Sequence, residues 1–207
     1  MINAIVLAAG ESRRMGKPKA LLRFRDRTFL EQIVTILRSS RADRITVVLG
    51  AQADVIAGAV DLSDADVVIN RDYRNGQLSS LVAGLEHIPQ QTEAILLCLA
   101  DHPFITTEVV DRIVEEFRRT NAPIVVPTFN GRRGHPTLFS RSMFKQLIGA
   151  PVEKGARHVV HSNEDKVFEV AVSDSNILVD INTADDYRSH LGVDPQESPT
   201  PCACEEL

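Results

Sequence analysis

The sequence predicts a single-domain α/β protein with three layers, α/β/α, around a mostly parallel sheet. Short apolar runs alternate with helical patterns over residues 3–129, which is typical of a doubly wound α/β fold. These runs lack polar–apolar alternation, as expected of strands covered by helices on both faces. The chain has 207 residues, which is enough for one domain with a sizeable core and short for two.

The first strand is expected over residues 3–8, directly before a glycine-containing loop that extends to about Pro18. Four further apolar runs of strand length follow along the chain. They lie at residues 44–50, 66–70, 94–100 and 123–129. The second part of the chain is less regular. It contains the segment 133–140, helices near 141–148 and 155–162, and the segment 166–172.

The first helix is expected over residues 28–40, where apolar side chains recur at helical spacing. Thr28 is a plausible N-cap, and Glu31 completes the pattern of a capping box. Further helices are expected at 53–60, 78–88 and 107–120, the last of them strongly amphipathic. A final helix begins near Thr183, with either Asn182 or Thr183 as a candidate N-cap.

Composition excludes several classes of protein. The formal net charge is −5, which argues against a general nucleic-acid binder. No apolar stretch approaches the roughly 20 residues of a membrane span, and the N-terminus lacks the layout of a signal peptide. Three cysteines give no disulfide framework. We therefore expect a cytoplasmic protein without membrane or nucleic-acid partners.

Domain boundaries follow from a change of composition after Gly192. Residues 1–192 are expected to form the domain, and residues 193–207 are rich in proline and acidic side chains. Such a segment can bury little apolar surface, so we expect a disordered C-terminal tail.

The glycine-containing loop after the first strand is a candidate phosphate site, because backbone N–H groups there can converge on an anion. Two common motifs do not fit. Gly10 and Gly16 are six residues apart, and Ser12 stands where the dinucleotide fingerprint requires glycine. The P-loop pattern fails because Pro18 follows Lys17 where serine or threonine is required.

The remaining pattern, A-A-G-x-S-x-R-M-G-x-P-K, resembles the signature of nucleotidyltransferases with the GT-A-type, Rossmann-like fold of nucleotide-diphospho-sugar transferases. It is most similar to the MobA-like NTP transferase family, which includes molybdenum cofactor cytidylyltransferases and guanylyltransferases. The resemblance implies that Arg14 and Lys19 contact the phosphates of an NTP and act as catalytic residues. It also implies a nucleotide loop of Leu7, Ala8, Ala9 and Gly10.

A metal ligand is expected at Asp101, which follows a buried strand at the edge where α/β sheets bind ligands. Nucleotidyl transfer requires Mg²⁺, and Mg²⁺ prefers oxygen ligands. Asp101 lies too far ahead of the next helix to cap it. The sequence also resembles the family's L-A-D-x-P motif, which implies a metal-binding and catalytic role for this residue.

A second metal ligand is expected near residues 180–186, which resemble the family motif D-[IV]-D-T-x-x-D. Asn182 stands where the motif has an acid. Its amide oxygen can bind Mg²⁺ without contributing charge. Three candidates for the second ligand therefore stay open, namely Asn182, Asp180 and a water molecule.

Two further segments resemble binding motifs of the family. Residues 70–85 are similar to its nucleotide segment, which implies that Gly76, Ser79 and Ser80 bind the nucleotide. Residues 131–140 are similar to its acceptor segment, which implies that Arg133, Gly134 and His135 meet the acceptor phosphate. His135 would donate a charge-assisted hydrogen bond there. Three residues of segment 153–160 are expected to extend this pocket: Lys154, Gly155 and Arg157.

The function expected from the resemblance is transfer of CMP from CTP to the phosphate of molybdopterin, with release of pyrophosphate and with Mg²⁺ as cofactor. The form L-A-A-G of residues 7–10, with a methyl group at Ala9, favours CTP. Two enzymatic alternatives stay open, a guanylyltransferase that uses GTP and a transferase acting on a sugar or polyol phosphate. A third is a non-catalytic carrier or insertion chaperone. A molybdenum enzyme or its maturation chaperone is the expected protein partner.

Overall fold

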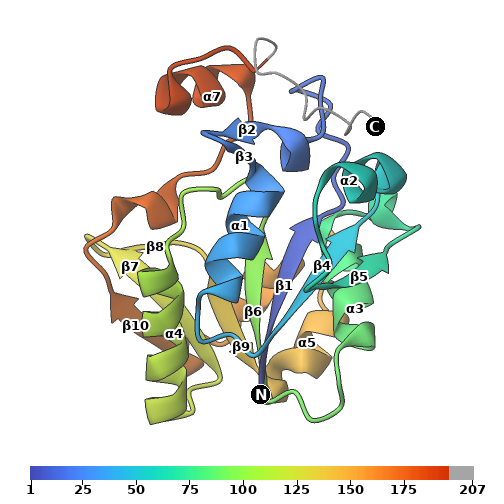
Figure 1. The fold of residues 1–207 in the computed structure, drawn as a ribbon. Helices are drawn as coiled ribbons and strands as arrows, with labels where there is room; N and C mark the ends of the chain where they lie inside the picture. Colours follow the sequence, from blue (N-terminus) through green and yellow to red (C-terminus); the bar gives the residue numbers. More distant parts are fainter. Residues whose placement is uncertain (196–207) are drawn as a thin grey trace.

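The computed structural model describes residues 1–195 and contains a central eight-stranded sheet (Figure 1). Its strands are β1 (Ile2–Ala8), β4 (Arg44–Leu49), β5 (Asp66–Ile69), β6 (Ala94–Leu99), β7 (Ile124–Phe129), β8 (Arg132–Arg133), β9 (Thr137–Ser140) and β10 (Val167–Ala171). A separate two-stranded hairpin joins β2 (Arg23–Phe24) to β3 (Arg27–Thr28).

The strand order is β10-β7-β9-β6-β1-β4-β5, with β8 paired to β7. Strand β9 runs antiparallel between β6 and β7, while β1 pairs in parallel with both β4 and β6. The mostly parallel α/β sheet expected from the sequence is therefore confirmed. This arrangement places the ends of β1 and β6 side by side at one edge of the sheet.

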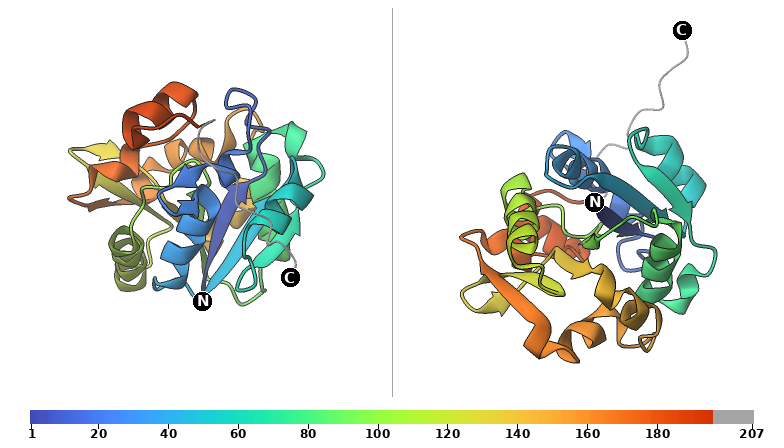
Figure 2. Two further views of the ribbon diagram at one scale, coloured as in Figure 1. Left: turned by 45° about the horizontal axis from the view of Figure 1, so that its top comes forward. Right: turned by 90° about the horizontal axis from the view of Figure 1, so that it is seen from below.

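Helices cover both faces of the sheet and form the outer two layers (Figures 1 and 2). The helices are α1 (Phe29–Arg38), α2 (Ala53–Ala59), α3 (Gln77–His87), α4 (Thr107–Thr120), α5 (Phe144–Ile148), α6 (Gly155–His161) and α7 (Ala184–Leu191). Residues from α1, α2 and α4 pack with one face of β1, and residues from α3, α5 and α6 pack with the other. Both faces of the strands are thus buried, which explains their continuous apolar sequences.

Local signals in the sequence set where several helices begin. Helix α1 starts at the capping box of Thr28 and Glu31, as expected. Helix α7 has a second capping box, formed by Thr183 and Asp186. Thr183, and not Asn182, is therefore the N-cap of α7. The Asn182 side chain is not used for capping and instead contacts Lys19 of the glycine loop.

A small third core joins the glycine loop to the C-terminal helix. Met15 from the loop packs in one cluster with Phe29, Ile181 and Tyr187, and Leu22 and Phe24 complete it. The Tyr187 hydroxyl also donates a 2.8 Å hydrogen bond to a carbonyl oxygen of β2. Segments from opposite ends of the chain are thereby held together at the carboxyl edge of the sheet.

One part of the described chain was not foreseen from the sequence. The β2–β3 hairpin has two-residue strands, which are too short to show a period in the sequence. Most of the predicted tail, 193–207, lies outside the described residues. Within residues 1–195, no helix combines the length and apolar character needed to cross a membrane.

Candidate active site

The loop after β1 is shaped by a serine and a glycine in the left-handed backbone region. Ser12 has φ of 52° and Gly16 has φ of 69°. The Ser12 carbonyl oxygen accepts a 2.9 Å bond from the Met15 nitrogen, and its hydroxyl accepts a 2.9 Å bond from the Lys19 nitrogen. Because Met15 is buried in the third core, the loop is anchored on both sides of its turn.

This loop lines a first cavity of about 340 Å³ between β1, α3 and the end of β6. The cavity is lined by all six loop residues that the sequence predicts as ligands: Leu7, Ala8, Ala9, Gly10, Arg14 and Lys19. Gly76 and Ser80 line it as well, together with Asp101 and Asn182. The fold therefore brings predicted residues from four distant segments of the chain to one concave surface.

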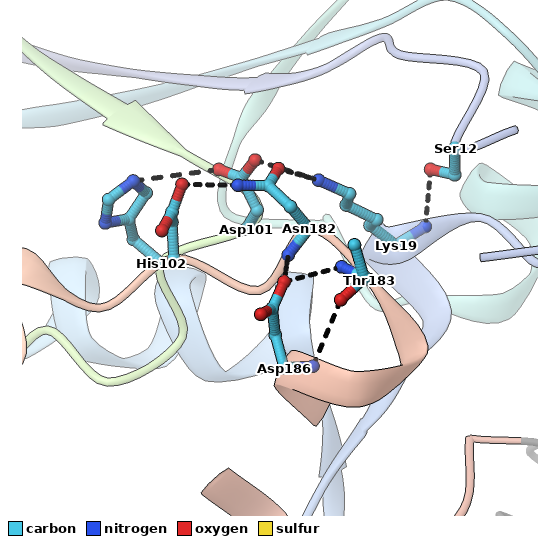
Figure 3. A network of polar contacts seen from close by, with 8 residues as sticks. Ser12, Lys19, Asp101, His102, Asn182, Thr183 and Asp186 are labelled. Atoms are coloured by element: carbon cyan, nitrogen blue, oxygen red, sulfur yellow. Dashed lines mark hydrogen bonds and ion pairs between the residues drawn. The ribbon is translucent and has the colours of Figure 1, made fainter. Parts of the chain in front are cut away.

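Lys19 connects Ser12 of the glycine loop with Asp101 and Asn182 (Figure 3). Its Nζ donates to Asp101 Oδ2 at 3.1 Å and to Asn182 Oδ1 at 2.7 Å. The Lys19 side chain is 17% exposed and that of Asp101 is 24% exposed. The carboxylate and the amide oxygen thus converge on a single positive charge.

The backbone and α7 hold Asn182 beside Asp101. The Ile181 nitrogen donates a 2.9 Å hydrogen bond to the Asp101 carbonyl oxygen. The Asp186 carboxylate accepts bonds from the backbone nitrogens of Asn182, at 3.0 Å, and Thr183, at 2.8 Å. The hydrogen bond with the Thr183 side chain, followed by these two backbone bonds, lowers the pKa of Asp186. The last helix therefore fixes the residue next to its own N-cap at the site.

These residues fit a divalent cation that also binds phosphate. Asp101 Oδ2 and Asn182 Oδ1 already face one cationic group, and Asn182 Nδ2 donates to the Asp180 carboxylate beside them. No group of three or more His, Cys, Asp and Glu side chains in residues 1–195 forms a metal cage. Mg²⁺ commonly uses one or two carboxylates and completes its shell with water and substrate phosphates, which matches this donor set.

A second cavity of about 820 Å³ lies on the other side of Asp101. Its lining includes the cationic side chains of Arg132, Lys154 and Arg157 as well as the carboxylates of Asp101 and Asp180. Apolar side chains form another part of its lining: Leu97, Val126, Phe139, Val160, Ile177 and Leu178. A ligand that carries both an anionic group and a flat or apolar body suits such a surface.

Arg133 also borders the second cavity, but its guanidinium is engaged by two carboxylates. It makes a bidentate contact with Glu164, at 2.8 and 2.6 Å, and a 2.7 Å contact with Glu169. These partners raise the pKa of Arg133. The geometry gives Arg133 the structural role of joining β8 to β10, because phosphate would have to compete with two glutamates for it.

His135 lies in the second cavity against His102, with ring centroids 4.7 Å apart. Burial lowers the pKa of His135 to about 4 and also lowers the pKa of His102. Both rings are therefore neutral at pH 7. A neutral His135 ring can still donate a hydrogen bond to an anionic phosphate, so the expected contact with the acceptor stays a prediction.

Gly134 lines the second cavity and also has a packing role that its motif does not reveal. A Cβ at this position would lie 2.7 Å from Ile177 Cγ1 and 2.8 Å from the Ile177 carbonyl carbon, and would collide with the carbonyl oxygen as well. Glycine is thus required for the close approach of the 177–182 segment. Its contact is with the Ile177 backbone, which positions the segment leading to Asp180.

The two predicted serines differ in their surroundings. Ser80 is buried and borders the first cavity, whereas Ser79 does not line it. Asn70 Nδ2 donates to both hydroxyls, at 2.9 and 3.0 Å. Ser79 in turn donates to the carbonyl oxygens of Asp72 and Gly76. The geometry gives Ser79 an internal role in shaping the Gly76 turn.

The two cavities meet at β6 and the start of α3. Gln77, Leu99 and Asp101 line both of them. Gln77 and the neighbouring Tyr73 of the first cavity were not singled out from the sequence. Only their position beside Gly76, in a segment already considered, pointed to them. The site is therefore a pair of adjoining cavities with one carboxylate between them.

The comparisons with known proteins place this chain among the nucleotidyltransferases. The model of the "MobA-like NTP transferase domain" family matches residues 4–167. The chain belongs to that family.

Curated relatives cover almost the whole chain. It is 29% identical to the molybdenum cofactor cytidylyltransferase of Escherichia coli strain K12, over 90% of this chain and 93% of the relative. It is 30% identical to a probable molybdenum cofactor guanylyltransferase of Mycobacterium avium strain 104, over 89% and 92%. It is also 27% identical to the nicotine blue oxidoreductase of Paenarthrobacter nicotinovorans, over 89% and 93%.

A solved structure supports the same assignment of fold. Rv0371c of Mycobacterium tuberculosis H37Rv is 34% identical and superposes with a TM-score of 0.84, over 93% of this chain and 97% of that chain. A manganese complex of Rv0371c is also known, and it superposes with a TM-score of 0.81 at 33% identity, over 93% and 98%.

Proposed function

We propose that this protein transfers CMP from CTP to the phosphate of molybdopterin and releases pyrophosphate. The observation that carries the proposal is the position of Asp101 between two cavities. The glycine loop lines one cavity, and cationic and apolar side chains line the other. Membership of the family and similarity to one molybdenum cofactor cytidylyltransferase support this choice, while other relatives are named as probable guanylyltransferases.

In the proposed reaction, an oxygen of the acceptor phosphate attacks the α-phosphorus of CTP. The bond from the α-phosphorus to the oxygen bridging it to the β-phosphorus breaks, and pyrophosphate leaves with that electron pair. A phosphate monoester is already anionic near pH 7, because its second pKa is about 6. No general base is therefore required, and catalysis depends on positioning and charge stabilisation.

Each cationic and acidic residue has a distinct part in this proposal. Arg14 and Lys19 of the first cavity neutralise phosphate oxygens, Arg14 through its planar fork and Lys19 as a point charge. Asp101, Asn182 and Asp180 would hold Mg²⁺, which when bound supplies positive charge to the phosphates. Arg132 and Arg157 attract the acceptor phosphate.

The choice of CTP rests on Ala9. A Cβ placed on Gly50 would lie 2.8 Å from Ala9 Cβ and 2.7 Å from Tyr73 Cβ, so these three residues pack closely. Ala9 and Tyr73 both line the first cavity. The methyl group of Ala9 leaves less space than glycine would, which favours the smaller pyrimidine.

Turnover with labelled nucleotides tests the proposal. Purified protein is incubated with molybdopterin, Mg²⁺ and either α-labelled CTP or α-labelled GTP, and both labelled product and pyrophosphate are measured. We expect faster transfer from CTP. Equal rates with both nucleotides would remove the assignment of the base, and absence of transfer from either would remove molybdopterin as acceptor. Sugar and polyol phosphates are then the acceptors to screen.

A non-catalytic carrier is the second candidate, favoured by the amide of Asn182 where the family motif has an acid. The variant Asp101→Ala distinguishes the two. A carrier would retain most of its binding to a molybdenum enzyme or maturation chaperone and would have no turnover to lose. An enzyme would lose turnover by a factor of about a thousand or more.

A further inference from the structure

Lys19 contacts the same oxygens that are proposed to hold the metal. Its Nζ lies 2.7 Å from Asn182 Oδ1 and 3.1 Å from Asp101 Oδ2, and Figure 3 shows the ammonium reaching both from the glycine loop. Hydrogen bonds of these lengths to a charged donor are well formed. Lys19 therefore acts as a counter-ion within the site in addition to lining the nucleotide cavity.

The position of this ammonium is built into the loop. The backbone nitrogen of Lys19 donates a 2.9 Å hydrogen bond to Ser12 Oγ, and the next residue, Ala20, is buried. Lys17 lies two residues earlier and points elsewhere, since its Nζ donates to the Pro195 carbonyl oxygen at 3.3 Å. Lys19 therefore contacts Asp101 and Asn182, whereas Lys17 of the same loop contacts neither.

We propose that Lys19 positions Asp101 and Asn182 in the absence of nucleotide and keeps a divalent cation from binding tightly until a nucleoside triphosphate draws the ammonium away. The inference rests on the proposed function for the identity of the two ligands. It adds an order to their binding. The nucleotide enters before the metal or together with it, and the metal alone binds weakly.

Electrostatics gives the reason. An ammonium and a divalent cation repel each other strongly within about 4 Å in a partly buried site, so they cannot share Asp101 and Asn182. A triphosphate beside the loop offers Lys19 a more strongly negative partner in the adjoining cavity. Release of the two oxygens then increases metal affinity, and thermodynamic linkage requires the metal to increase nucleotide affinity by the same factor.

Titration with Mn²⁺ alone tests this inference without any turnover. Free Mn²⁺ is followed by electron paramagnetic resonance in the wild-type protein, in Lys19→Met and in the matched control Lys17→Met. We expect Lys19→Met to bind Mn²⁺ about tenfold more tightly than the wild type, because a competing charge is removed. Lys17→Met should bind as the wild type does. Lys19→Gln serves as a second neutral variant, and thermal unfolding verifies that each variant is folded.

A second titration contains a non-hydrolysable CTP or GTP analogue. The wild type should then bind Mn²⁺ more tightly than without nucleotide, and this increase should be smaller in Lys19→Met. Unchanged Mn²⁺ affinity in folded Lys19→Met and Lys19→Gln would overturn the inference. So would a wild type that binds Mn²⁺ equally well with and without nucleotide. The arm with metal alone does not depend on the acceptor, so a failure of transfer to molybdopterin would contradict only the proposed function.

Discussion

The backbone nitrogen of His135 donates a 2.9 Å hydrogen bond to the carbonyl oxygen of Ile177. This bond joins the loop before β9 to the segment that leads to Asp180 and Asn182. Gly134 allows the contact, since any side chain there would overlap the Ile177 backbone. This bond therefore links the wall of the second cavity to the segment that carries the proposed metal ligands.

The variant Gly134→Ala is expected to separate these two segments. Its Cβ meets backbone atoms that cannot turn away as a flexible side chain would, so we expect a loss of about 1–3 kcal/mol in unfolding free energy. Mn²⁺ affinity in the presence of nucleotide should fall as well. Urea unfolding and Mn²⁺ titration measure the two effects. Gly58→Ala, where the added Cβ meets nothing within 4 Å, should show neither loss, and equal behaviour of both variants would contradict the prediction.

Asp101→Asn keeps the shape of the side chain and removes its charge. We expect turnover to fall by a factor of about a thousand or more, because the group between the two cavities loses its anionic character. Pyrophosphate release reports the rate, and thermal unfolding reports the fold. The exposed residue Asp64, which pairs with Arg38, provides the control Asp64→Asn with full activity. Substantial activity of Asp101→Asn would speak against its role.

Asn182→Asp restores the acid of the family motif. The amide of Asn182 donates to the Asp180 carboxylate, so the variant places two carboxylates together without the hydrogen bond. We expect a lower melting temperature without divalent metal and tighter binding of Mn²⁺ than in the wild type. Calorimetric melting with and without Mn²⁺ measures both. Failure of Mn²⁺ to restore the melting temperature would argue that residue 182 is not a ligand.

The neutral state of His135 predicts a dependence of stability on pH. Its pKa falls from 6.5 to about 4 in the folded protein, so the unfolded chain binds more protons between these values. The associated stability is fully present above pH 6.5 and is lost as the pH falls towards 4. At pH 5 the loss is at most about 2 kcal/mol.

Urea unfolding at pH 7 and pH 5 measures this loss. His135→Gln should show a smaller decrease than the wild type, while the exposed residue His87 offers the control His87→Gln, which should decrease as the wild type does. An identical decrease in all three proteins would assign the effect to other groups.

Ala9→Gly tests the choice of base. Loss of the methyl group next to Gly50 and Tyr73 widens the first cavity, so we expect the ratio of kcat/KM for GTP to that for CTP to rise. Ala51→Gly removes a buried methyl nearby that does not line the cavity. The ratio should not change in this control. A constant ratio in Ala9→Gly would show that other side chains select the base.

The sequence allowed the layers to be predicted because each strand is an apolar run and each long helix has an apolar stripe. Thr28 and Glu31 even marked the first turn of α1. The β2–β3 hairpin was missed because two-residue strands have no period. The motifs predicted that Lys19 and Asp101 belong to the same site, but they could not show that the two side chains contact each other. That contact depends on the packing of Met15 and Ile181 in a shared core.

The role of Gly134 was hidden for a related reason. Its neighbour Ile177 is 43 residues away, and a motif shows only that glycine occurs, not which atoms approach it. The neutral state of His135 likewise depends on burial beside His102. Contacts between distant segments thus decide the roles that local patterns leave open.

The two cavities on either side of β6 divide the chain into successive parts. Apart from Asn182, the first cavity is lined by residues 7–101. Most of the second is lined by residues 126–180. Under the proposed function, recombination after β6 would exchange the acceptor preference and keep most of the nucleotide cavity, with only Asn182 supplied by the new second half.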